Sequence, residues 1–132
     1  MVYGRSEPPV ATEKMRDVMS LRPFETRSLG ERPDVKAPDG SDVRILLSLD
    51  RGSMAHFTLM PGTTSQAIRH RTVEEIWYII SGDGEMWRRT DDKEETIPLS
   101  PGISLTIPVG TLFQFRASGE TPLQAVAVTM PP

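Results

Sequence analysis

From Val43 to Met130 the chain consists of short β-rich runs separated by turn signals. Pro61-Gly62 and Pro101-Gly102 are two of these turns, and each is followed by another run. Short strands at such regular spacing predict an antiparallel β-sandwich or barrel, so we expect an all-β fold. The expected strands are residues 43–49, 55–60, 65–69, 76–80, 84–89, 95–99, 103–107, 112–116 and 122–130.

The first third of the chain has a different character. Residues 1–10 are polar and contain prolines, which predicts a loose arm, and residues 11–20 carry apolar side chains at helical spacing. Pro23 should end this helix, because the residue before a proline avoids the helical conformation. Residues 28–42 contain turn-forming residues and no clear periodicity. We therefore divide the chain into an N-terminal arm with a short helix, residues 1–42, and a β-barrel, residues 43–132.

Composition narrows the classes of function. The chain of 132 residues fits one domain, and its net charge of −3 with 25% charged residues gives no basic patch for nucleic acid. No apolar run approaches the roughly 20 residues that span a bilayer, and the N-terminus lacks the apolar centre of a secretory signal. Cysteine is absent, which excludes thiolate ligands and nucleophiles. We expect a cytoplasmic protein that binds neither nucleic acid nor membranes.

Two segments carry glycine, proline and polar residues at fixed spacings. The first runs from Gly62 through His70 and Glu75 to Gly82, and the second contains Gly102, Pro108 and Gly110. These spacings resemble the two signatures of the cupin family, in its small single-domain form. The resemblance covers roughly residues 43–130 and implies a double-stranded β-helix of the jelly-roll type.

Cupin signatures usually also provide four metal ligands, and two of those positions differ here. Ile68 stands where the first histidine belongs, and Phe113 stands at the histidine of the second motif. His70 and Glu75 match the remaining two positions. The resemblance therefore implies a metal site of which only half is present.

Alternation of side chains along a strand suggests which residues face the barrel interior. Gln66, Ile68 and His70 share one face of their strand, and Glu75, Trp77 and Ile79 share one face of the next. Together with Phe113, these residues predict an apolar chamber in which His70 and Glu75 supply the polar groups. Such a lining is typical of a site for a small organic molecule.

Three hypotheses follow for the function. The first is a barrel that binds a small organic molecule without an obligatory metal, with His70 and Glu75 as candidate catalytic residues for isomerase- or lyase-type chemistry. The second is a dioxygenase-like enzyme in which His56, His70 and Glu75 hold iron, manganese, nickel or zinc. The third is a structural or regulatory barrel filled by its own aromatic side chains. Whether the protein is an enzyme stays open at this point.

The strand over residues 76–80 also has an apolar outer face. Ile76, Tyr78 and Ile80 alternate with the inward residues and should point away from the barrel. Small cupins commonly pair their sheets as homodimers, so the resemblance implies a homodimer that uses this stripe.

Overall fold

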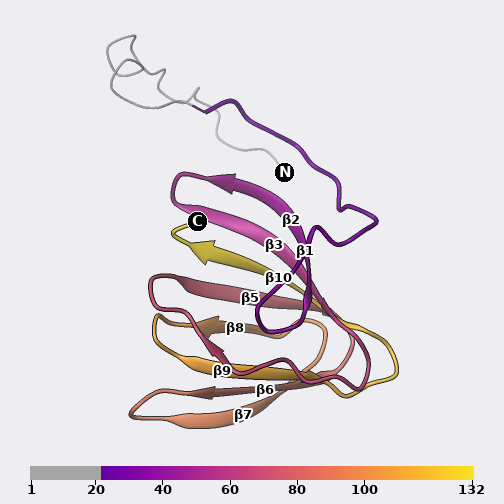
Figure 1. Cartoon of the computed structure of the whole chain (residues 1–132), viewed down its shortest axis with the longest axis vertical. Coiled ribbons are helices and arrows are strands. Elements are labelled where there is room, and N and C mark those ends of the chain that lie inside the picture. Colours follow the sequence, from indigo (N-terminus) through magenta and orange to yellow (C-terminus); the bar gives the residue numbers. More distant parts are fainter. Residues whose placement is uncertain (1–21) are drawn as a thin grey trace, which may run out of the picture.

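The computed structural model describes residues 22–132, and these residues form two antiparallel β-sheets (Figure 1). The expected arm, residues 1–10, and helix, residues 11–20, lie outside the described residues. The larger sheet has the strand order β1-β2-β3-β10-β5-β8, and the smaller has the order β4-β9-β6-β7. The strands are β1 (Val35–Lys36), β2 (Asp42–Leu49), β3 (Gly52–Leu59), β4 (Ile68–Arg69), β5 (Glu74–Ser81), β6 (Gly84–Arg89), β7 (Glu94–Leu99), β8 (Ser104–Ile107), β9 (Leu112–Ala117) and β10 (Leu123–Met130).

The all-β jelly-roll expectation is confirmed in these residues. The nine expected runs correspond to β2 through β10, with boundaries shifted by a few residues. The short strand β1 was missed, because two residues are too few to show a periodic pattern, and it is held by its pairing with β2. Within residues 22–132 no helix is long and apolar enough to cross a membrane.

The two Pro-Gly pairs form equivalent turns. Gly62 and Gly102 have φ angles of 76° and 95°, which favour glycine. In each turn the amide of the residue after the glycine donates to the carbonyl of the residue before the proline. Proline followed by a glycine of positive φ is the signature of a type II turn. The turns that the sequence predicts at these positions are therefore present.

The core lies between the two sheets and is built by alternation along the strands. In β5, Glu75, Trp77 and Ile79 are buried, whereas Ile76, Tyr78 and Ile80 are exposed, as the sequence pattern predicts. Trp77 is the centre of an aromatic group, with its ring edge-on to those of Phe113 and Phe115. Aromatic pairs prefer such edge-to-face contacts, and their apolar area stabilises the contact between the sheets.

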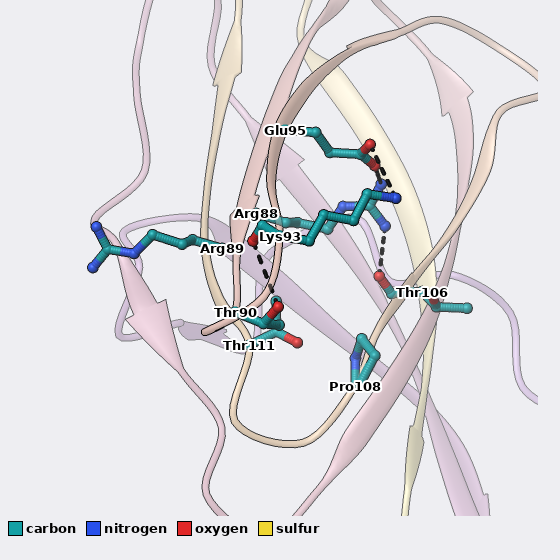
Figure 2. A pocket seen from close by; sticks show the side chains of 8 residues that line it. All are labelled: Arg88, Arg89, Thr90, Lys93, Glu95, Thr106, Pro108 and Thr111. Carbon is teal, nitrogen blue, oxygen red and sulfur yellow. Dashed lines mark hydrogen bonds and ion pairs between the residues drawn. The ribbon is translucent and has the colours of Figure 1, made fainter.

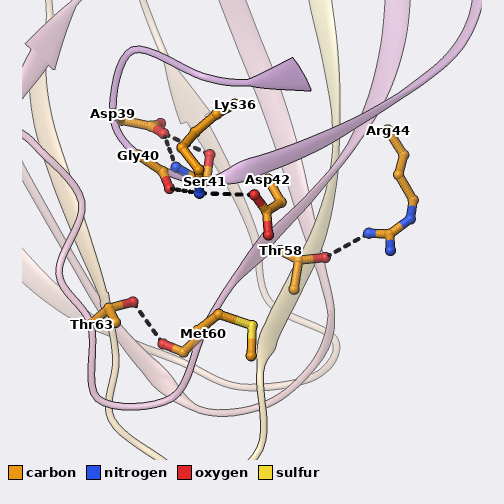
Figure 3. Close-up of polar contacts among 9 residues, drawn as sticks. All are labelled: Lys36, Asp39, Gly40, Ser41, Asp42, Arg44, Thr58, Met60 and Thr63. Carbon is orange, nitrogen blue, oxygen red and sulfur yellow. Dashed lines mark hydrogen bonds and ion pairs between the residues drawn. The ribbon is translucent and has the colours of Figure 1, made fainter. Parts of the chain in front are cut away.

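A compact loop, residues 37–41, joins β1 to β2 and closes one side of the barrel. The buried carboxylate of Asp39 accepts hydrogen bonds from the amide and hydroxyl of Ser41 at 2.8 and 2.6 Å (Figure 3). The carbonyl of Asp39 also accepts from the amide of Gln66 at 2.7 Å. The loop is therefore fixed both internally and against the segment that leads into β4.

Candidate functional site

A cavity of about 390 Å³ lies between the sheets at the side of the barrel that this loop closes. Strands β3, β4, β5 and β9 and the 37–41 loop supply its walls, so segments from residue 37 to residue 113 meet there. The lining residues are Ala37, Pro38, Asp39, Phe57, Ile68, Arg69, His70, Glu75, Trp77 and Phe113. The volume is within the range of small-molecule sites.

Apolar and aromatic side chains form the greater part of the lining. Phe57 on β3 stacks on Trp77 with ring centroids 5.3 Å apart and planes 7° from parallel. Ile68 and Phe113 are cross-strand partners in the smaller sheet. The two residues that replace the usual histidines therefore lie side by side and form one apolar wall.

The polar lining of the cavity includes His70 and Glu75, whose side chains lie close together. His70 Nε2 lies 3.3 Å from Glu75 Oε1, and the side chains are 27% and 6% exposed. The ring of His70 is 5.5 Å from that of Phe113. The backbone of His70 is held as well, because its carbonyl accepts from the amide of Gly110 at 2.9 Å. The imidazole is thus half-buried, oriented and open to the cavity.

Glu75 has hydrogen-bond donors on both carboxylate oxygens. The indole N–H of Trp77 donates to Oε1 at 2.9 Å, and the hydroxyl of Thr129 donates to Oε2 at 2.6 Å. These donors, together with His70, fix the carboxylate in one orientation, which compensates for its burial. The arrangement suits a carboxylate that orients a histidine.

The structure places the other site candidates differently. Gln66 is exposed and outside the cavity, because regular strand structure begins only at Ile68 and the expected alternation does not extend back to it. Ile79 shares the inner face with Trp77 but is fully buried in the core and does not line the cavity. The shared inward face expected for Gln66, Ile68 and His70 is therefore wrong at Gln66.

His56 does not join His70 and Glu75. Phe57 and Leu59 occupy the inner face of β3, so His56 points to the opposite face of the sheet. Burial lowers the pKa of His56 from its ordinary value, and the nearby Arg44 acts in the same direction. The ligand set of His56, His70 and Glu75 is wrong, because alternation on β3 places the buried His56 on the face of the sheet opposite the cavity.

Sequence reasoning missed Phe57, Arg69 and the 37–41 loop as parts of the site. The alternation of Ala55, Phe57 and Leu59 was the available signal for Phe57, because that parity is the more apolar one. No local signal indicates that the loop packs over the barrel. That contact depends on the hydrogen bond between the carbonyl of Asp39 and the amide of Gln66.

The donor set does not fit a metal ion. Of the four positions of the cupin signatures, His70 and Glu75 carry ligand atoms and Ile68 and Phe113 carry none. The other carboxylate of the lining, Asp39, accepts hydrogen bonds from the amide and hydroxyl of Ser41. In the described part of the chain, no group of three or more histidine, cysteine, aspartate or glutamate side chains could hold a metal. Transition metals in proteins generally need at least three such ligands.

Comparisons with known proteins agree with this architecture. Comparison with curated protein sequences finds no match. Among solved structures, KdgF from Halomonas sp. is similar with a TM-score of 0.66 and 18% identity, over 77% of this chain and 89% of that protein. BH2720 from Bacillus halodurans has a TM-score of 0.63 and 20% identity, over 75% of this chain and 74% of that protein. A predicted oxalate decarboxylase from Thermotoga maritima has a TM-score of 0.58 and 24% identity, over 68% of this chain and 79% of that protein.

The family model described as "Cupin domain" matches residues 55–129. This match begins within β3 and ends within β10, so it includes both sheets and most of the residues that line the cavity. It also covers more than half of the 132 residues. The chain therefore belongs to the cupin family.

Proposed function

We propose that this cupin binds a small organic molecule in the cavity beside His70 and Glu75, without an obligatory metal. The observation that carries the proposal is a cavity of about 390 Å³ with aromatic walls and one oriented polar pair. Ligand sites commonly combine a largely apolar surface with a few fixed polar groups.

The lining also indicates the chemical class of the ligand. Phe57 and Trp77 are stacked on each other, and Trp77 and Phe113 meet edge to face, so they offer flat apolar surfaces. The exposed Arg69 belongs to the same lining and contributes a positive charge that a carboxylate could approach. A small aromatic or unsaturated molecule fits the flat walls, and an acid group on it would have to reach Arg69 rather than the carboxylates of Asp39 and Glu75 in the same lining.

His70 and Glu75 support proton transfer as the chemistry of the site. A histidine oriented by a carboxylate is a common arrangement for a general base. In this proposal His70 would accept a proton from the bound molecule. Returning it at another position gives an isomerase-type reaction, and passing it to a group that leaves as a double bond forms gives a lyase-type reaction. Glu75 would orient the imidazole through the contact between Nε2 and Oε1.

Ligand screening with matched variants tests this proposal. We expect one or more small organic acids to raise the melting temperature of the protein, because a ligand that binds only the folded state stabilises it. Replacing His70 by alanine should weaken binding about tenfold or more, as expected for loss of one hydrogen bond to a charged group. Replacing Ile68 by tryptophan should abolish binding by filling the cavity. Calorimetric titration would measure both effects.

The control variant is Gln66→Ala, which changes an exposed side chain on the segment before β4 and should leave affinity unchanged. Loss of binding in Gln66→Ala, or unchanged binding in both His70→Ala and Ile68→Trp, would contradict the proposed site. Elemental analysis of the same proteins tests the metal-dependent alternative. Near-stoichiometric metal that disappears in His70→Ala would overturn the metal-free part of the proposal.

The structural or regulatory alternative has less support from the geometry. A barrel filled by its own aromatic side chains would leave no cavity at His70, whereas Phe57, Trp77 and Phe113 surround one of about 390 Å³. Under this alternative His70→Ala would have no effect on any ligand. The binding measurements above therefore separate the two hypotheses.

We also propose that the protein forms a homodimer through the outer face of the larger sheet. The strand register places Met54, Val128 and Ile76 in one row across β3, β10 and β5, with Val126 and Tyr78 in the next row. These side chains are exposed or half-buried. Contiguous exposed apolar surface of this kind marks interaction sites, and a twofold axis would bury the same face on both copies.

Replacing Tyr78 by glutamate is expected to convert the dimer into a monomer, because the new charge would be desolvated at the centre of the paired face. Light scattering after size-exclusion chromatography would measure the mass directly. Val109→Glu is the matched control, since Val109 is 51% exposed on a loop and Tyr78 is 49% exposed on the sheet. A monomeric wild-type protein, or equal dissociation of both variants, would contradict this interface.

A further inference from the structure

The loop of residues 37–41 contributes an acidic side chain to the cavity beside His70. Asp39 lines this cavity and is 3% exposed. One of its carboxylate oxygens, Oδ1, accepts from the amide and the hydroxyl of Ser41 at 2.8 and 2.6 Å, and Figure 3 shows both contacts. Aspartate and asparagine commonly form this kind of turn with the residue two positions further on. The turn accounts for one oxygen of the carboxylate.

The other oxygen, Oδ2, has no hydrogen-bond donor and no cation beside it among residues 22–132. It is also not one of the unpaired side-chain atoms that are completely enclosed there, which are His56 Nδ1, Arg88 Nε and Thr111 Oγ1. Oδ2 therefore retains accessible surface. Because Asp39 is almost wholly buried and lines the cavity, this surface faces the cavity.

A second cavity shows the contrast with enclosed groups. It has a volume of about 200 Å³ and lies where the end of the β6–β7 hairpin meets β8 and the loop before β9 (Figure 2). Its unpaired atoms, Arg88 Nε and Thr111 Oγ1, have almost no accessible surface, so a molecule in that cavity could not reach them. Arg88 and Lys93 both pair with Glu95, as Figure 2 shows. Asp39 Oδ2 differs, because it is both unpaired and accessible.

The conformation of the 37–41 loop does not require a carboxylate at this position. The amide of Gly40 donates to the carbonyl of Ala37 at 2.9 Å, and the amide of Ala37 donates to the carbonyl of Ser41 at 2.8 Å. An asparagine could accept the same two hydrogen bonds from Ser41 through its single side-chain oxygen. A buried carboxylate oxygen without a partner costs free energy. The second oxygen of Asp39 therefore points to a donor outside the chain.

The other charged groups of the lining do not provide that donor. Glu75 is a second carboxylate, and its oxygens already accept from Trp77 and Thr129. Arg69 belongs to the lining but is exposed, and within residues 22–132 no ion pair joins it to Asp39. Two carboxylates against one arginine favour a hydrogen-bond donor in the ligand over an anion at this end of the cavity.

We propose that Asp39 selects the ligand of this cavity by accepting a hydrogen bond from it. Oδ2 accepts from a hydroxyl or amino group of a flat molecule that lies against Phe57, Trp77 and Phe113. Hydrogen bonds to a charged acceptor are stronger than those between neutral groups, and a low local dielectric strengthens them further. The inference rests on the proposed function, because it requires a ligand in this cavity, and it adds that the ligand carries a donor.

Three probes with one carbon skeleton test this inference: 1-phenylethanol, 1-phenylethylamine and acetophenone. The first two carry a hydrogen-bond donor, and the third carries only an acceptor. Each is titrated into the full chain, and nuclear magnetic resonance follows the indole N–H of Trp77 and the amide of Gln66, which donates to the carbonyl of Asp39. We expect at least one donor probe to bind about tenfold more tightly than acetophenone. The tighter of the two donor probes identifies the donor as a hydroxyl or an amine.

Asp39→Asn tests the role of the free oxygen directly. It keeps one oxygen for Ser41 and replaces the other by an N–H donor, so we expect acetophenone to bind more tightly than both donor probes. Ser41→Ala is the matched control. It removes the hydroxyl that donates to Oδ1 and changes no residue of the cavity lining, so the preference should change less than twofold. If Asp39 only shaped the loop, Asp39→Asn would not reverse the preference.

Equal affinity of the three probes for the wild-type protein would overturn the inference, and this comparison holds even if Asp39→Asn does not fold. If that common binding is lost in Ile68→Trp, the proposed function stands and only the role of Asp39 fails. Absence of saturation with all three probes would also overturn the role of Asp39. The screen of small organic acids tests the cavity itself, so failure of this inference is distinguishable from failure of the proposed function.

Discussion

Replacing Trp77 by alanine is expected to lower the free energy of unfolding by about 3–5 kcal/mol, the range measured for large aromatic residues in protein cores. Trp77 is 1% exposed, and its ring contacts those of Phe57, Phe113 and Phe115. Its removal would leave a void between the sheets. It would also remove one of the donors that hold Glu75. Urea unfolding followed by far-ultraviolet circular dichroism would measure the loss.

Trp77→Phe separates these two contributions. It retains most of the aromatic volume but removes the indole N–H that donates to Glu75 Oε1 at 2.9 Å. We expect a smaller loss of stability, about 1–3 kcal/mol, because the buried carboxylate of Glu75 loses one hydrogen-bond donor. A loss below about 1 kcal/mol in Trp77→Ala would mean that this aromatic group does not hold the sheets together.

Replacing Gly82 by alanine is the second change with a large expected effect. Gly82 has a φ of 85°, and an added Cβ would lie 2.4 Å from the carbonyl oxygen of Pro122 and 2.8 Å from the Cα of Leu123. Both neighbours are backbone atoms, so neither can move aside at low cost. We expect about 3 kcal/mol or more of destabilisation, from the left-handed backbone and the overpacking together.

Gly62→Ala is the matched control for this variant. Gly62 has a similar φ of 76°, but an added Cβ would meet nothing within 4 Å. At Gly62 only the cost of the left-handed backbone applies, so we expect a destabilisation of about 1–2 kcal/mol. Chemical unfolding measures the loss of stability in each variant, and the difference between the two losses is the cost of the steric clash at Gly82. Equal losses at the two glycines would show that the β5–β6 connection is not packed against the start of β10.

This glycine also shows where local reasoning stops. The glycines at Gly82 and Gly84 indicate a hairpin turn between two strands. In the structure, β5 belongs to the larger sheet and β6 to the smaller one, so the chain crosses between sheets there. A local pattern predicts a turn but does not specify the partner of the next strand. That choice depends on the packing of both sheets around one core.

In the candidate site, too, local patterns predicted some side-chain directions and not others. Alternation on β5 correctly predicted that Glu75 and Trp77 point inward. The strand is eight residues long, and buried and exposed side chains alternate along it. The same argument failed for Gln66, where only Ile68 and Arg69 form regular strand. On β3 the more apolar parity, that of Ala55, Phe57 and Leu59, is the inner face, so His56 lies on the other face.

The sequence by itself determined the all-β class, the Pro-Gly turns and the juxtaposition of His70 with Glu75. Each of these depends on residues close together in the chain, through backbone conformation and side-chain alternation. Only the tertiary structure decided that Phe57 and the 37–41 loop complete the cavity, and that Arg88 and Thr111 line a second one. These groupings join strands far apart in the sequence, and burial of a shared core, which acts without regard to sequence separation, selects them.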